Sequence, residues 1–255
     1  PNAQFELTAG LSYSKRRTDD LGSNLYPAPG TTPVGVLLGG VADYDLYEYS
    51  GSPNIFETET YRATVKARYS LDSFDIVSLT GYVHADNLQN LDYDGTTANA
   101  LYFNSYHGAR DFSQEFQLLS NDSASPVQWV VGAYYFKGKA VEPYLRLKQG
   151  TLYTDTVDNP GAFPAGGSIT TISSRGPTRA LAAYGQATYA VSDNTRITAG
   201  LRYTSEKRKL SFEVTGVGQI APGFYSPTPV VLVTDDGQRR ASFDKITWRL
   251  ALDHD

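Results

Sequence analysis

The chain has 255 residues, a net charge of −5 and a pI near 5.2, and its 22 Lys and Arg residues are scattered along the sequence. The absence of a basic patch argues against a nucleic-acid partner. The absence of cysteine excludes a disulfide framework, a thiolate nucleophile and a zinc–cysteine site. The 19 Tyr, 11 Phe and 23 Gly favour strands with frequent turns. No apolar run approaches the roughly 18 residues of a membrane-spanning helix.

The pattern predicts eight strand segments, at residues 3–17, 58–71, 74–87, 109–121, 127–142, 179–191, 195–210 and 241–253. Short joints of turn-forming residues alternate with long joints, which cover residues 18–57, 88–108, 143–178 and 211–240. A compact soluble domain rarely tolerates four loops of this length. An outer-membrane barrel has short periplasmic turns at one rim and long extracellular loops at the other.

Alternation within the strands predicts two chemically different faces, because successive side chains of a strand point to opposite sides. In the second segment the odd positions from Tyr61 to Leu71 are apolar, whereas the even positions from Arg62 to Ser70 are cationic or polar. A soluble sandwich with one wet face gives the same parity, and the alternation of loop lengths favours the membrane. Lipid-facing girdle aromatics are predicted at Tyr13, Tyr61, Tyr69, Tyr203 and Trp248, and lumen-facing charges at Arg62, Lys66, Arg68, Arg202 and Arg249.

Two hairpins and the strand before them resemble those of TonB-dependent outer-membrane receptors. The resemblance is carried by residues 76–82 (IVSLTGY), 112–121 (FSQEFQLLSN), 128–136 (QWVVGAYYF), 183–189 (AYGQATY) and 197–207 (ITAGLRYTSEK), in the order found in that family. It implies an all-β, antiparallel transmembrane β-barrel of about 22 strands around a plug. Residues 1–255 then form about eight strands of one barrel domain, and the plug domain and the remaining strands lie outside this chain.

The same resemblance implies a receptor of the Gram-negative cell outer membrane that is surrounded by lipid. Such a receptor binds and imports a scarce solute, such as a ferric siderophore, another metal chelate or a saccharide. TonB supplies the energy through a plug segment that is absent here. The solute itself and the oligomeric state cannot be read from the sequence.

Binding is the chemistry that the side chains support. Aromatic residues of the long joints are candidates for capturing solute at an extracellular mouth, namely Tyr44, Tyr47, Tyr49, Tyr93, Tyr102, Phe103, Tyr106 and His107. The lumen-facing cations have two possible roles, pairing with acidic groups of the plug, which we prefer, or attracting an anionic ligand. We expect no enzyme, cofactor or metal site, because His84, His107 and His254 lack metal-ligand spacing and no nucleophile motif stands out.

Two alternatives make different structural predictions. A small closed barrel of eight strands with a structural or adhesive role requires the first strand, Phe5 to Tyr13, to pair with the last, Ile246 to Leu252. An outer-membrane hydrolase requires an acid, a base and a nucleophile clustered at one rim.

Overall fold

The computed structural model describes residues 4–19, 36, 41, 54–92, 101–149, 168–221, 224–225 and 230–254. Its strands are β1 (Phe5–Asp19), β2 (Ile55–Ser70), β3 (Phe74–Asp92), β4 (Leu101–Ser120), β5 (Val127–Gln149), β6 (Ser168–Ser192), β7 (Thr195–Ala221), β8 (Phe224–Tyr225) and β9 (Val230–His254). The prediction of an all-β antiparallel chain is confirmed, and each of the eight predicted segments coincides with a strand. The two-residue β8, which pairs with the end of β7, was not predicted.

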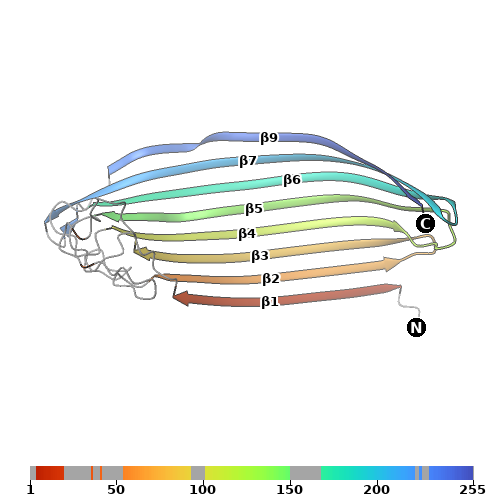
Figure 1. Cartoon of the computed structure of the whole chain (residues 1–255), viewed down its shortest axis with the longest axis horizontal. Coiled ribbons are helices and arrows are strands. Elements are labelled where there is room, and N and C mark those ends of the chain that lie inside the picture. Colours follow the sequence, from red (N-terminus) through yellow and green to blue (C-terminus); the bar gives the residue numbers. More distant parts are fainter. Residues whose placement is uncertain are drawn as a thin grey trace.

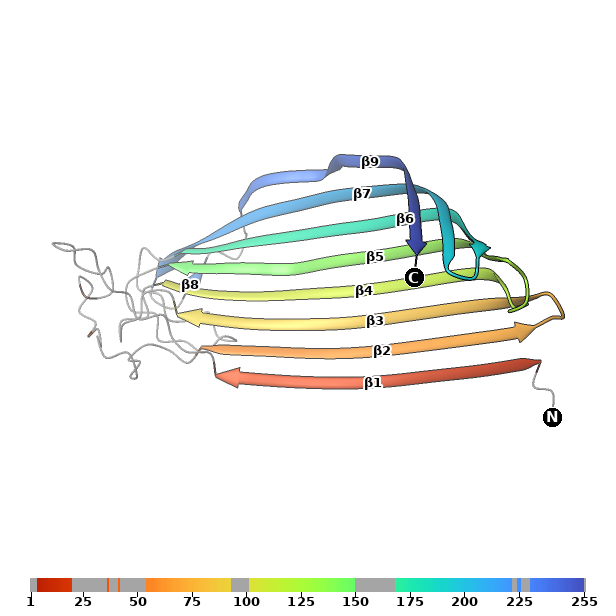
Figure 2. The same ribbon diagram turned by 45° about the vertical axis from the view of Figure 1, so that its right-hand side comes forward.

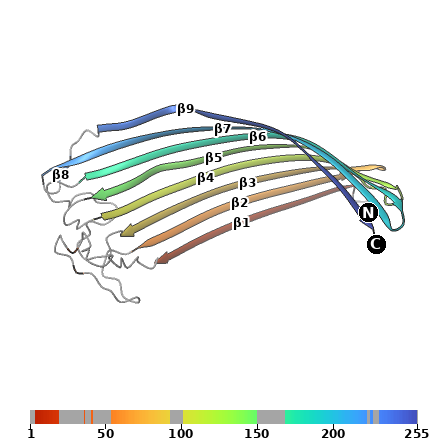
Figure 3. The ribbon, with the colours of Figure 1, turned by 45° about the horizontal axis from the view of Figure 1, so that its top comes forward.

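All the strands belong to one curved sheet in which chain neighbours pair side by side from β1 to β7, and β9 pairs with β7 (Figure 1). Figures 2 and 3 show the curvature from two further directions. The short connections β2–β3, β4–β5 and β6–β7 lie at one end of the sheet, together with the start of β1 and the end of β9 (Figure 1). The long connections therefore begin at the opposite end, as the alternation predicted.

The strands extend much farther toward that opposite end than the alternation predicted. Strand covers residues 88–92 and 101–108 of the first expected joint and residues 143–149 and 168–178 of the second, because β3 continues to Asp92, β4 begins at Leu101, β5 continues to Gln149 and β6 begins at Ser168. β7 has 27 residues, which corresponds to roughly 90 Å of extended chain. An apolar band is only about 25 Å tall. The prediction was wrong here because the backbone ladder continues beyond the segment in which side chains alternate.

The antiparallel registers align the side chains of all the strands into the same two faces of the sheet. Residues opposite each other in a ladder share a face, and the pairs Thr64–Gly81, Tyr184–Arg202 and Arg202–Thr247 belong to one such series. We call it the polar face; between the short turns and the register shifts near the long connections, it comprises the even positions of β1, β2, β5, β6 and β7 and the odd positions of β3, β4 and β9. The remaining positions form the apolar face, which includes the pairs Tyr13–Tyr61 and Leu201–Trp248.

Large exposed hydrophobic side chains are gathered on the apolar face. Leu11 is 87% exposed, Trp248 77% and Leu250 68%, and of the exposed large hydrophobics in the described part of the chain only Val41, Leu71, Leu210 and Phe243 lie elsewhere. The buried hydrophobic residues among those described, Val77, Ala180 and Ala182, lie on the polar face. Exposed apolar patches above several hundred Å² are rare in soluble monomers. The sheet therefore has no sandwich core and presents one continuous apolar surface.

The closed eight-stranded alternative is wrong for this structure. β1 pairs with β2 and β9 pairs with β7, and no ladder joins β1 to β9 although both strands are described. A two-sheet sandwich is excluded too, because β1 to β7 and β9 form one sheet. Within the described ranges, no helix has the length and hydropathy needed to cross a membrane.

Asp75 joins two of the short turns. Its carboxylate is 3% exposed, pairs with the guanidinium of Arg68 on the neighbouring strand, and accepts a 3.1 Å hydrogen bond from Asn121 Nδ2. The same Asn121 amide donates to the carbonyl oxygen of Leu71 at 2.7 Å. The β2–β3 turn and the end of β4 are thus held together through one buried carboxylate.

We predict that Asp75→Ala lowers the free energy of unfolding by about 2 kcal/mol, because it removes charge-assisted hydrogen bonds from Arg68 and Asn121. Urea unfolding of the intact protein measures the change. The matched control is Asp72→Ala, since Asp72 is exposed in the same turn, and it should change stability by less than about 0.5 kcal/mol. Equal effects of the two substitutions would contradict the role given to Asp75.

Candidate functional site: the polar face around Tyr184

All five predicted lumen-facing cations lie on the polar face, but their surroundings differ. Arg68 is already neutralised within the wall by Asp75. Arg62, Lys66, Arg202 and Arg249 have no carboxylate within ion-pair distance among the residues that the structure describes. These four cations are therefore available to partners outside the sheet.

The centre of this face is a network around Tyr184 on β6. The Tyr184 hydroxyl donates to Glu115 on β4 and accepts a 3.0 Å hydrogen bond from Gln117 Nε2, which also donates to Glu115 at 3.0 Å. The guanidinium carbon of Arg202 lies 5.7 Å from the Tyr184 ring centre and 6.0 Å from that of Tyr134. A cation held over aromatic faces is stabilised by their quadrupoles. The network thus combines one carboxylate and one guanidinium that are bridged by tyrosines.

Gly132 makes room for the Tyr184 ring. It is the cross-strand partner of Tyr184 on β5, and a Cβ added at Gly132 would lie 2.5 Å from the ring and 2.9 Å from the Phe116 carbonyl oxygen. Any larger residue would displace the ring. The position of the Tyr184 hydroxyl between β4 and β6 therefore depends on a glycine between them.

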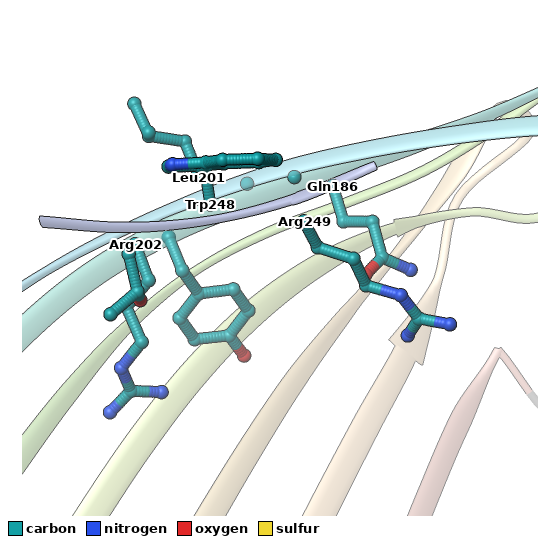
Figure 4. A pocket seen from close by; sticks show the side chains of 9 residues that line it. Gln186, Leu201, Arg202, Trp248 and Arg249 are labelled. Atoms are coloured by element: carbon teal, nitrogen blue, oxygen red, sulfur yellow. The ribbon is translucent and has the colours of Figure 1, made fainter. Parts of the chain in front are cut away.

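A hollow of about 230 Å³ adjoins the network. It forms where Gly200 of β7 has no side chain between Gln186 of β6 and Arg249 of β9, the two residues paired with it. Figure 4 shows Gln186, Arg202 and Arg249 on the side of the ribbons where the other strands lie, whereas Leu201 and Trp248 extend to the opposite side. The hollow thus offers cationic and amide groups, which are suited to a carboxylate or another anionic oxygen group.

The predicted girdle aromatics all lie on the apolar face. Tyr13 and Tyr61 are in contact, with ring centres 4.9 Å apart, and their hydroxyls donate to Glu59. Tyr203 and Trp248 lie in adjacent rows of the β7–β9 ladder, and Tyr69 lies near the short-turn end of β2. Further aromatics of the same face, which the sequence prediction missed, are Tyr82, Phe112 and Tyr135.

Only some of the aromatic residues that were predicted to capture solute belong to the described part of the chain. Tyr44, Tyr47, Tyr49 and Tyr93 lie outside the described residues. Tyr102, Phe103, Tyr106 and His107 lie in β4 and not in a loop, contrary to prediction, because the ladder with β3 extends to Asp92. The Tyr106 hydroxyl donates to Asp86 on that neighbouring strand.

No group of three or more His, Asp or Glu side chains that could hold a metal ion occurs in the described part of the chain. The three histidines are found in different settings, since His84 contacts Asp86 at 3.0 Å, His107 lies in the long-connection half of β4, and His254 contacts Thr195 at the short-turn end.

The residues of the Tyr184 network that sequence reasoning missed are Glu115, Gln117 and Tyr184 itself. Glu115 and Gln117 share a face by parity, which was a usable sign of a polar cluster, but Gln114 on the opposite face obscured it. The Gln114 side chain is satisfied on the apolar face by Thr80 and Ser78, at 2.6 and 2.9 Å.

Comparison with known proteins agrees with this architecture. The family model described as TonB dependent receptor-like, beta-barrel matches residues 4–255. Among solved structures, the ferric-catecholate import receptor Fiu from E. coli K12 is similar with a TM-score of 0.60 and 15% identity, over 98% of this chain and 42% of Fiu. The ferric yersiniabactin uptake receptor FyuA from Yersinia pestis is similar with a TM-score of 0.51 and 16% identity, over 79% of this chain and 26% of FyuA. No curated protein matches the sequence.

A wall of long antiparallel strands with one apolar and one polar face defines the chain as a β-barrel segment of outer-membrane type. The chain belongs to the TonB-dependent receptor β-barrel family. It spans less than half the length of the two solved receptors. This is a family of receptors and not of enzymes, which confirms the prediction about enzymatic activity at the level of the family.

We predict that Gly132→Ala destabilises the protein by about 1–3 kcal/mol, because the new methyl group overlaps the Tyr184 ring. Gly176→Ala is the matched control. Gly176 is on β6 and lies on the polar face, as Gly132 does, and its added Cβ would meet its nearest neighbour at 3.8 Å. The control should be neutral or stabilising by up to about 1 kcal/mol. Urea unfolding measures both variants, and a smaller cost of Gly132→Ala in a Tyr184→Leu background than in the unmodified protein would identify the ring as the main cause.

Proposed function

We propose that the chain forms part of the wall of a receptor in the cell outer membrane of a Gram-negative bacterium, and that this receptor imports a scarce solute with energy from TonB. The observation that carries the proposal is the uninterrupted exposed apolar face from β1 to β9, opposite a polar face with unpaired cations. Hydrocarbon on one side and a filled, wet lumen on the other satisfy both faces. Residues 1–255 then belong to one barrel domain, whose remaining strands and plug are contributed by other residues.

Two observations support the proposed class of solute: the names of the similar solved structures and the charge of the polar face. Fiu is named for ferric-catecholate import and FyuA for ferric yersiniabactin uptake. An anionic ferric chelate suits a lumen with Arg62, Lys66, Arg202 and Arg249 on its wall. A ferric siderophore is therefore the first solute to test, before other metal chelates and saccharides.

The four unpaired cations have two candidate partners, acidic groups of the plug or the anionic solute itself. We favour the plug, because charges on the wall of a filled barrel need fixed partners to offset the loss of water. The proximity of Glu115 and Arg202 to the same tyrosine, Tyr184, supports this view. A plug group that bonds to either residue is held by the whole network.

Transport is tested by measuring accumulation of radiolabelled ferric chelates in cells with and without the gene. Cells that carry the gene should accumulate at least one chelate, and a protonophore should abolish accumulation, because TonB coupling depends on the energised inner membrane. Unchanged accumulation in the deletion strain across siderophores, other chelates and saccharides would refute import.

The membrane orientation predicts opposite responses at two adjacent residues of β2. Val65→Lys places a charge on the apolar face midway between Tyr61 and Tyr69, and should cost about 2–4 kcal/mol of stability in a bilayer. Thr64→Lys places the same charge on the polar face, opposite Gly10 and Gly81, and should cost less than about 0.5 kcal/mol. Urea unfolding in phospholipid vesicles measures both, and equal costs would refute the orientation.

The role of the polar-face cations is tested by Arg202→Gln/Arg249→Gln in the intact receptor. If these residues hold the plug, conductance across a planar bilayer rises in the variant while affinity for the ferric chelate is retained. Arg196→Gln, on the same face at the short-turn end, is the control and should leave conductance unchanged. Lower affinity with unchanged conductance would assign the two arginines to the solute.

A further inference from the structure

Cations adjoin the aromatic girdle on the apolar face of β4 to β6. Moving two residues along each strand toward the long connections, Arg110 follows Phe112, Lys137 follows Tyr135 and Arg179 follows Leu181. Two residues of a strand span about 7 Å. Each cation thus lies directly beyond the apolar surface and on the same side of the sheet. We call Arg110, Lys137, Lys139 and Arg179 the cationic belt; His84 of β3, which contacts the Asp86 carboxylate at 3.0 Å, lies beside it.

The belt residues face one another across the ladders. Arg110 pairs with Lys139, while Lys137 pairs with Arg179, whose other neighbour is Lys207 of β7. Like charges directly opposite each other in a sheet are destabilising. Such rows are therefore costly unless an anion from outside the sheet lies between them.

No carboxylate of the described residues lies within ion-pair distance of Arg110, Lys137, Lys139 or Arg179, and all four are exposed. The neighbouring strands β1 and β2 differ on the same face. There, Lys15 pairs with Glu57 at 2.8 Å and Arg17 with the same carboxylate at 3.8 Å. Among the described residues, the exposed cations of this face that lack an ion pair thus lie on the strands beyond β2.

A hollow of about 220 Å³ lies within the belt. It is lined by His84, Asp86, Tyr106, Gly108, Ala109, Arg110 and Lys139. The hollow forms where Gly108 has no side chain and the β4–β5 register shifts between Tyr106 and Gly108. Two exposed cations, Arg110 and Lys139, thus converge on a space large enough for a phosphate group.

We propose that the belt binds the phosphate-bearing headgroup of an anionic membrane lipid, with the phosphate in the hollow at Arg110 and Lys139. The acyl chains of that lipid lie on the apolar surface around Phe112 and Tyr135. This arrangement explains why the cations are adjacent to the apolar surface and not on the polar face. The proposal rests on the membrane orientation proposed above, and it adds a specific lipid partner to it.

The test uses the intact protein in nanodiscs of phosphatidylcholine that contain a minor share of phosphatidylglycerol or diphosphoryl lipid A. Mass spectrometry of protein released from the discs measures how far the retained anionic lipid exceeds its share in the bilayer. We expect enrichment in the unmodified protein. Each cation near the surface contributes roughly a fivefold preference for anionic lipid, so Arg110→Gln/Lys139→Gln should lower the enrichment fivefold or more.

The matched control is Lys15→Gln/Arg17→Gln, which removes two cations from the same face where carboxylates already pair with them. It should retain the enrichment. Equal loss in the control and the belt variant would overturn the proposal, and so would displacement of the lipid by an equal concentration of inorganic phosphate. A protein that enters the nanodiscs without enriching anionic lipid refutes the belt alone, whereas a protein that does not enter them refutes the membrane orientation as well.

Salt provides a second measurement that needs no variant. Raising ionic strength from about 0.01 M to about 1 M shortens the Debye length from about 30 Å to about 3 Å. Enrichment by the unmodified protein should fall over this range. Enrichment that is independent of salt would mean that apolar contacts alone retain the lipid, which contradicts a role for the belt.

Discussion

The structure depends on antiparallel register, which carries two faces without interruption from β1 to β9. A slip of one residue in any ladder would exchange the faces of every strand beyond it. Irregularities that exchange the faces occur at Tyr106/Gly108, Glu142/Leu145, Ala190/Ser192 and Val214/Thr215, whereas the shift at Leu210/Phe212 keeps the parity. All except the one at Ala190/Ser192 lie on the long-connection side of the segment with large apolar side chains. That segment therefore keeps an unbroken ladder.

Charged side chains have different partners on the two faces of the sheet. On the polar face, Asp75 and Glu115 are satisfied by residues of other strands, and cations such as Arg62 and Arg249 have no ion-pair partner among the described residues. On the apolar face, polar groups inside the band satisfy one another, as Thr80, Ser78 and Gln114 do. Among the described residues, the cations of that face that lack an ion pair lie beyond the aromatic side chains, where the proposed membrane would present phosphate and water.

Sequence patterns located the part of each strand in which apolar and polar side chains alternate, but not the strand ends. Alternation records an environment that differs between two faces, and it disappears where both faces meet water. The ladder between β3 and β4 nevertheless continues to Asp92 and Tyr102, because backbone hydrogen bonds do not require alternating side chains. For the same reason Phe103, Tyr106 and His107 were predicted to be loop residues although they belong to β4.

By itself, the sequence determined the all-β class, the eight long strands, the alternation of short and long connections, and the face on which each predicted cation and girdle aromatic lies. These properties follow from side-chain period and turn chemistry, which are local. Only the tertiary structure decided which residues meet, such as Tyr184 with Glu115, 69 positions away, or Arg110 with Lys139. These contacts depend on the register between strands. Long connections leave that register undefined in the sequence, and the packing of the whole sheet sets it.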